Sequence, residues 1–93
     1  MTVYIDDMYL YPVGRLGQMK MSHMIADSTE ELMAMADKIR VDRKWIQKEG
    51  TPDEHFDISR SARDRALACG AVPITMRQMA MMIRERRNSV LKR

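Results

Sequence analysis

Two capping boxes, each followed by apolar residues at helical spacing, are the features that most restrict how this chain can fold. In the first box, residues 28–31, a serine is followed three residues later by a glutamate, and apolar residues then recur on one helical face from Leu32 to Ile39. In the second box, residues 75–78, a threonine is followed by a glutamine at the same spacing. The boxes predict one central helix and a longer C-terminal helix over residues 75–92.

The segments outside these helices have the composition of short β-strands, rich in β-branched and aromatic residues or alternating in polarity. A third helix, which Ser59 or Ser61 can cap and Gly70 ends, separates the last two of them. Because strands alternate with helices, we expect an α/β fold with a small, mostly parallel sheet of three to four strands, a right-handed crossover and about three packed helices. The expected strands are residues 2–5, 19–26, 44–47 and 71–74.

Length and composition indicate a single domain over residues 1–93 that lies in the cytoplasm. The chain is 45% hydrophobic and 31% charged, which is typical of a globular protein. It begins without a secretory signal and has no apolar run long enough to cross a membrane. Its one cysteine, Cys69, cannot form an internal disulfide, as expected in a reducing compartment.

Several polar side chains lie at expected strand ends or in loops, where ligands of α/β proteins bind. Two imidazoles and a carboxylate, His23, His55 and Asp57, can bind a divalent metal, and nearby arginines can hold a phosphate. Hydrolysis of a phosphoester would follow, with the metal activating water and a histidine moving a proton. The ligand-binding candidates are Asp6, Arg15, His23, Asp27, Arg43, His55 and Asp57.

The same residues have structural interpretations. Asp27 and Asp57 lie just before residues that cap helices, and His23 belongs to an apolar run in which a histidine is more often a hydrogen-bonded core residue. Asp6 is followed by Asp7, and the two point to opposite faces if the strand continues through them. No spaced metal-ligand motif or phosphate-binding glycine loop is present, so the residue types alone favour a ligand site without defining it.

The C-terminal helix carries most of the excess positive charge, although the net charge of the chain is only +3. Its arginines can contact the backbone of a nucleic acid, or they can be a solvated helix face. Eleven methionines suggest flexible core packing rather than a copper site, while Met81 and Met82 can form a surface that docks a host protein. The oligomeric state is not indicated. The nucleic-acid candidates are Arg77, Arg84, Arg86 and Arg87.

Two polar runs carry a resemblance to a known family. Ser-His-Met-Ile-Ala-Asp at residues 22–27 and His-Phe-Asp-Ile at residues 55–58 resemble DUF4031, a small bacterial and phage family of unknown function, over nearly the whole chain. The chain departs from the family at Met35, where histidine is frequent, and at Phe56, where tyrosine is frequent. The resemblance implies a fold of this size and a bacterial or phage source, in the latter case acting in the host cytoplasm, and it brings no activity.

Overall fold

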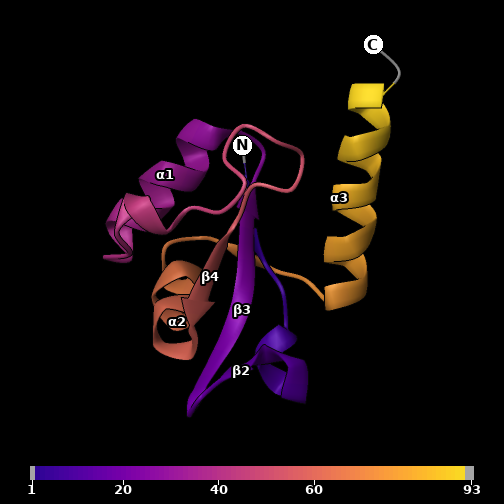
Figure 1. Ribbon diagram of the computed structural model, residues 1–93. Coiled ribbons are helices and arrows are strands. Elements are labelled where there is room, and N and C mark those ends of the chain that lie inside the picture. Colours follow the sequence, from indigo (N-terminus) through magenta and orange to yellow (C-terminus); the bar gives the residue numbers. More distant parts are fainter. Residues whose placement is uncertain (1, 92–93) are drawn as a thin grey trace.

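The computed structural model describes residues 2–91 and confirms the α/β class, with three α-helices packed on a five-stranded sheet (Figure 1). Three short 3-10 helices lie in the connections. The strands are β1 (Val3–Ile5), β2 (Arg15–Leu16), β3 (Met19–Ala26), β4 (Phe56–Ser59) and β5 (Val72–Pro73). The helices are α1 (Thr29–Lys38), α2 (Arg60–Ala68) and α3 (Met76–Leu91), with the 3-10 turns η1 (Met8–Leu10), η2 (Pro12–Gly14) and η3 (Arg43–Trp45).

Strand β3 organises the sheet because β1, β2 and β4 all pair with it, each antiparallel. The one parallel pair within residues 2–91 joins β1 to β5. The expectation of a mostly parallel sheet of three to four strands is therefore wrong. Parallel neighbours need a crossover of a dozen or more residues, usually a helix. Residues 6–18 instead form η1, η2 and the β2 strand of a tight hairpin, so the chain returns antiparallel along β1.

The caps identified in the sequence hold the helix ends. Ser28 accepts a hydrogen bond from the amide of Glu31 at the start of α1, and Ser59 accepts one from Ala62 at the start of α2. Thr75 and Gln78 form the reciprocal box, each side chain accepting from the other's amide. The expected C-terminal helix is observed as α3, and residue 92, where it was expected to end, lies outside the described residues.

Residues 44–47 are not a strand, contrary to the expectation. They overlap η3, whose first turn is capped by Asp42 through the amide of Lys44, and only Gln47 forms an isolated bridge, with His55. The capped turn uses the local backbone donors that a strand would need for pairing. The edge strand expected around Pro73 is confirmed as β5, where a residue without an N–H can be tolerated.

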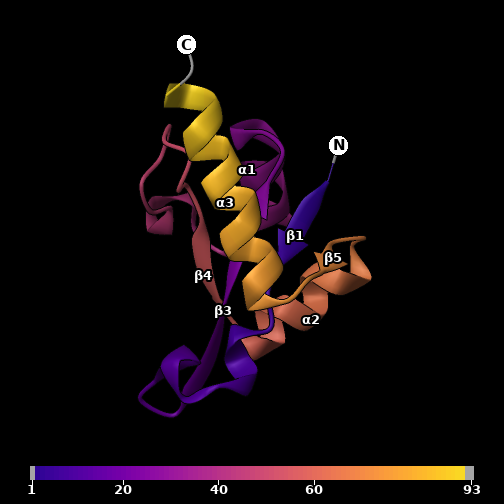
Figure 2. The same cartoon turned by 90° about the vertical axis from the view of Figure 1, so that its right-hand side faces the viewer.

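The helices form two layers around the sheet. In Figure 1, α1 and α2 lie on one side of the strands and α3 stands on the other, and Figure 2 shows α3 crossing in front of β3. The main core lies between the sheet and α1 and α2, where Ile5, Met24, Leu32, Phe56 and Ile58 are almost completely buried. No helix in the described part of the chain is long and apolar enough to span a membrane.

Two hydrogen bonds join the helix α3 to the end of β3 and to the segment that follows β1. The amide of Met76 donates to the Asp7 carboxylate at 2.8 Å, and the Arg86 guanidinium donates to the backbone oxygen of Ala26 at 2.8 Å. Between these two contacts Met79 is the buried residue of the helix. Helix α3 therefore packs less tightly on its face of the sheet than α1 and α2 do on the opposite face. This leaves room for a site between α3 and the sheet.

Gly14 gives a direct test of the connection between β1 and β3. A Cβ atom at this position would lie 2.2 Å from the backbone oxygen of Met8 and 3.0 Å from that of Met21. Because both contacts are with backbone, a side-chain rotation cannot relieve them. We expect Gly14→Ala to lower the free energy of unfolding by about 3 kcal/mol, at the upper end of overpacking costs. Urea unfolding measures this, with Gln18→Ala, an exposed change in the neighbouring turn, expected within about 0.5 kcal/mol of wild type. Equal stability of the Gly14 and Gln18 variants would show that the connection is not packed as described.

Candidate metal centre

Cross-strand register brings polar residues from three strands onto the sheet face below α3. Asp6 follows β1 and its amide donates to the backbone oxygen of His23 at 3.1 Å, which extends the β1–β3 ladder by one residue. On the other side of β3, His23 is the register partner of Asp57 in β4. Residues directly opposite one another point to the same face of a sheet. His55 lies two residues before Asp57 and therefore projects to the same side.

The first of these residues, Asp6, is a buried carboxylate with a full set of donors. Its Oδ1 accepts from the amides of Met8 at 3.1 Å and His23 at 2.9 Å, while its Oδ2 lies 2.7 Å from Nδ1 of His23. A buried carboxylate is costly unless its charge is met by hydrogen bonds, and these three contacts meet it. Asp6 thus fixes the orientation of the His23 ring.

One nitrogen of the His23 imidazole contacts the Asp6 carboxylate, and the other is available to a ligand. The Asp6 carboxylate raises the pKa of His23 above its usual 6.5, mainly through the Nδ1 hydrogen bond, although partial burial acts in the opposite direction and Asp57 adds a smaller electrostatic contribution. The carboxylate keeps the proton on Nδ1. Nε2 is then the nitrogen whose lone pair becomes free when the ring is neutral.

His55 and Asp57 are oriented in the same manner. Nδ1 of His55 lies 2.7 Å from the backbone oxygen of Asp53, and Nε2 of Gln47 donates to Oδ2 of Asp57 at 2.7 Å. Metal-ligating histidines usually donate their second N–H to a carboxylate or a carbonyl, which fixes ring and tautomer. Each of the three side chains therefore has one atom that contacts a partner outside the cluster and one atom that remains available inside it.

The three inner atoms converge. Oδ1 of Asp57 lies 3.7 Å from Nε2 of His23 and 3.6 Å from Nε2 of His55, and the three donor atoms all lie within 4.8 Å of one another. Ligands bound at about 2.1 Å in a tetrahedral arrangement are about 3.4 Å apart, close to the two distances measured from Oδ1 of Asp57. Within residues 2–91, Oδ1 of Asp57 is shielded from solvent and accepts no hydrogen bond. A buried oxygen without a donor is rare in native proteins, and a cation would satisfy it.

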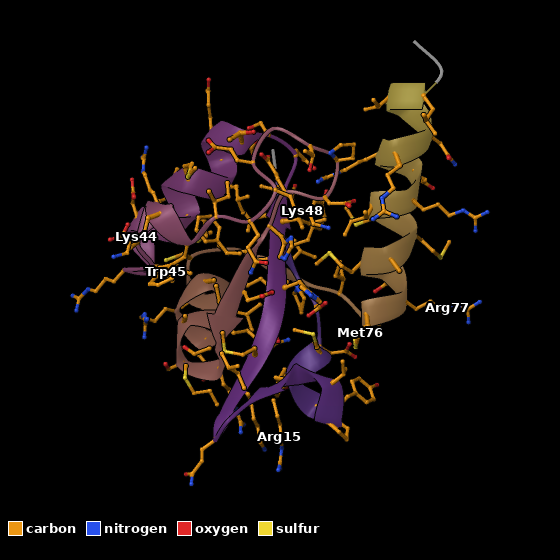
Figure 3. The ribbon with its side chains drawn as sticks, viewed as in Figure 1. Arg15, Lys44, Trp45, Lys48, Met76 and Arg77 are labelled. Atoms are coloured by element: carbon orange, nitrogen blue, oxygen red, sulfur yellow. The ribbon has the colours of Figure 1, made fainter. Side chains whose placement is uncertain are left out.

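A cavity of about 330 Å³ opens beside the cluster, between the sheet and α3. The side chains of Lys48, Asp53 and Arg87 lie on its polar wall, and Arg87 binds the Asp53 carboxylate through two hydrogen bonds of 2.7 and 2.6 Å. The helix supplies an apolar wall that includes Met76. In Figure 3, Lys48 lies near the centre of the view and Met76 at the base of α3, whereas Arg77 points away from the sheet.

The remaining ligand-binding candidates lie elsewhere. Arg15 is exposed in β2 at the hairpin end of the sheet (Figure 3), and Arg43 forms two hydrogen bonds with Asp37 on the far side of the fold. Asp27 accepts a hydrogen bond from the amide of Thr2. The structure thus brings together Asp6, His23, His55 and Asp57 and separates them from Arg15, Asp27 and Arg43. Ligand binding by any of these residues stays a prediction.

The arginines of α3 differ in the contacts that they make within the fold. Arg77 and Arg84 are exposed, but Arg86 donates to the backbone of β3 and Arg87 is paired with Asp53. Two of the four arginines expected to contact a nucleic acid therefore form contacts within the fold. Nucleic-acid binding by this helix stays a prediction.

The residues that support the cluster carry little signal in the sequence. Gln47 lies in a segment expected to be a strand, and Lys48 and Asp53 lie between that segment and the next expected helix. Their positions depend on how the loop folds back over β4, where Gln47 bridges to His55. A Gly-Thr-Pro-Asp turn close before a His-x-Asp pair is the one local signal that could have linked them.

The fold and the cluster define a small α/β protein with a group of two histidines and an aspartate that could hold a metal ion. The chain belongs to the family described as Protein of unknown function (DUF4031), which matches residues 3–86 and confirms the resemblance seen in the sequence. Comparison with curated proteins and with solved structures gives no significant match.

The coupling between Asp6 and His23 can be tested by titration. In metal-free protein, Asp6→Asn removes the charge that raises the pKa of His23, so the pKa should fall measurably in an NMR titration of the ring protons. His55→Gln leaves the Asp6 contact in place and should keep the pKa of His23 raised. An unchanged pKa in the Asp6 variant would contradict the assigned hydrogen bond.

The same pair makes stability depend on pH. Because folding raises the pKa of His23, protonated His23 stabilises the folded state fully below pH 6.5, and this contribution is lost as the pH rises through the raised value. Urea unfolding with a chelator present should show this loss in wild type. The Asp6→Asn variant should lack this part of the pH dependence. An equal loss of stability with rising pH in both proteins would contradict the role of the Asp6–His23 pair.

Proposed function

We propose that this protein binds a divalent transition-metal ion through Nε2 of His23, Nε2 of His55 and Oδ1 of Asp57. The observation that carries the proposal is the shielded Oδ1 of Asp57, which has no hydrogen-bond donor among the described residues 2–91 and faces two imidazole nitrogens at 3.7 and 3.6 Å. These distances are too long for hydrogen bonds but suit three ligands around one ion.

The alternative to a metal is a protonated histidine that compensates Asp57 electrostatically. Protonation of His23 would supply charge, yet at 3.7 Å its Nε2–H does not form a hydrogen bond with Oδ1 of Asp57. The outer contacts also favour a metal, because the Nδ1 atoms of both histidines already have acceptors at 2.7 Å. Such contacts raise the basicity of a ligating ring and fix the tautomer that presents Nε2.

The donor set selects among metals. Two imidazoles and one carboxylate suit Zn²⁺, Fe²⁺, Co²⁺, Ni²⁺ or Mn²⁺ better than Ca²⁺ or Mg²⁺, which prefer oxygen ligands. Three protein ligands leave coordination positions open, as in catalytic rather than structural zinc sites. Those positions would face the cavity below α3. The cluster therefore has the ligand count of a reactive centre rather than of a structural crosslink.

An ion with open positions can lower the pKa of a bound water and polarise a bound oxyanion. A phosphate-containing ligand would suit the site, because a phosphate oxygen can replace water on the metal while nearby cations contact the other oxygens. Hydrolysis of a phosphoester is the reaction that this arrangement would support. The cations that line the cavity are Lys48 and Arg87, rather than Arg15 and Arg43, which the sequence suggested.

Metal binding can be measured by thermal unfolding and by calorimetry. A metal at about a hundred times its dissociation constant should stabilise the wild-type protein by roughly 2.7 kcal/mol and raise the unfolding midpoint. Asp57→Asn should abolish most of this shift, because a neutral amide is a poor ligand. Affinity should also fall at acid pH, where protonated His23 competes with the metal.

A matched control is Asp64→Asn, which neutralises an exposed carboxylate on α2 and should leave the metal-induced shift unchanged. Circular dichroism of each variant checks that the fold is retained. The proposal fails if Zn²⁺, Co²⁺, Ni²⁺, Mn²⁺ and Fe²⁺ all leave the wild-type midpoint unchanged, or if Asp57→Asn responds as strongly as wild type.

A further inference from the structure

The cavity beside the cluster has a cation whose charge is only loosely compensated. Arg87 occupies both oxygens of the Asp53 carboxylate at 2.7 and 2.6 Å. Lys48 approaches the same carboxylate only to 3.7 Å, which is beyond hydrogen-bond distance, and its side chain is 63% exposed. The ammonium group of Lys48 therefore lines the cavity with the Asp53 carboxylate as an ion-pair partner that Arg87 already occupies with two hydrogen bonds.

The backbone holds Lys48 in an unfavourable conformation. Its φ angle is +53°, in the left-handed region that side-chain-bearing residues adopt at an energetic cost. The backbone oxygen of Lys48 accepts from the amide of Thr51 at 3.1 Å and from its hydroxyl at 2.7 Å. Farther along the loop, the buried Glu54 carboxylate binds the Gly50 amide and the Thr29 hydroxyl. The loop is thus anchored to α1 and presents Lys48 from a fixed position.

The wall opposite the metal ligands is apolar. It consists of side chains of α3 that point toward the sheet, and Met79 among them is almost completely buried. A volume of about 330 Å³ exceeds that of inorganic phosphate and lies at the lower end of small-molecule sites. A ligand that fills the cavity therefore needs an apolar part in addition to an anionic group. The apolar lining residues are Met76, Met79, Ala80 and Ile83.

From these features we infer that Lys48 and the metal together bind the phosphate group of a small organic phosphate, whose apolar part packs against α3. The inference rests on the proposed metal site. A tetrahedral phosphate can give one oxygen to the metal and another to the ammonium group, for which lysine acts as a point charge. A carboxylate has fewer oxygens and less charge to share between two cations, so it fits this pair less well.

The experiment measures binding of phenylphosphonate to the metal-loaded protein by calorimetry. This probe combines a phosphate-like dianion with an apolar ring and has no ester bond to hydrolyse. We expect Lys48→Met to weaken its binding about tenfold or more, since a charge-assisted contact is lost. Lys44→Met is the matched control, because Lys44 is an exposed lysine that lies beside Trp45 on the far side of the fold (Figure 3), and it should bind the probe as wild type does.

Two further ligands separate the parts of the inference. Benzoate, which has the ring without the phosphonate, should bind about tenfold more weakly or worse, because a single negative charge is shared between the metal and Lys48. Inorganic phosphate, which lacks the ring, should bind roughly fivefold more weakly, because it buries no apolar surface. Equal affinity of benzoate and phenylphosphonate would overturn the assignment of phosphate.

Metal affinity is measured separately for the wild type and for Lys48→Met. If both proteins bind the metal equally and phenylphosphonate binds both equally, the role of Lys48 is wrong while the metal site stands. If the wild type binds no metal, the proposed function fails and this inference fails with it. Loss of phenylphosphonate binding in Lys48→Met, with metal affinity retained, is the result that supports the inference.

Discussion

A buried carboxylate, that of Asp6, connects the end of the sheet to the candidate metal centre. It accepts hydrogen bonds from the backbone amides of Met8 and His23, which fix the chain as it leaves β1, and it contacts the His23 ring through Nδ1. Removing any of these donors would leave part of a buried charge uncompensated, which is costly. The carboxylate therefore determines at once the path of the backbone, the orientation of one imidazole and the nitrogen atom that this imidazole presents to the cavity.

The other two side chains of the cluster are held in the same way, because each is oriented by a hydrogen bond to a residue outside the cluster. The backbone oxygen of Asp53 orients His55, and Gln47 orients Asp57. Since Arg87 binds the side chain of Asp53, the helix α3, the loop before β4 and one imidazole are coupled through a single residue. Two layers of structure thus meet at the cavity, and the antiparallel pairing of β3 and β4 sets the separation between His23 and Asp57.

Local signals predicted the helices well, because capping and apolar spacing act within a few residues. Sheet topology could not be predicted in the same way, since the direction of β3 depends on how the two 3-10 turns and the hairpin strand after Asp6 return the chain along β1. His23, His55 and Asp57 were named from their side-chain chemistry, but their convergence depends on β4, a four-residue strand that leads directly into α2. Lys48 carried no signal, because its position is set by a loop folded over other strands.

The most direct test of the metal centre is NMR spectroscopy of nitrogen-15-labelled histidine side chains during titration with Zn²⁺. Ligation through Nε2 should shift the Nε2 resonances of both His23 and His55, while both Nδ1 atoms stay protonated and bound to their present acceptors. Unchanged Nε2 resonances at saturating zinc, or ligation through Nδ1 of either ring, would contradict the arrangement of two histidines and Asp57 around one ion.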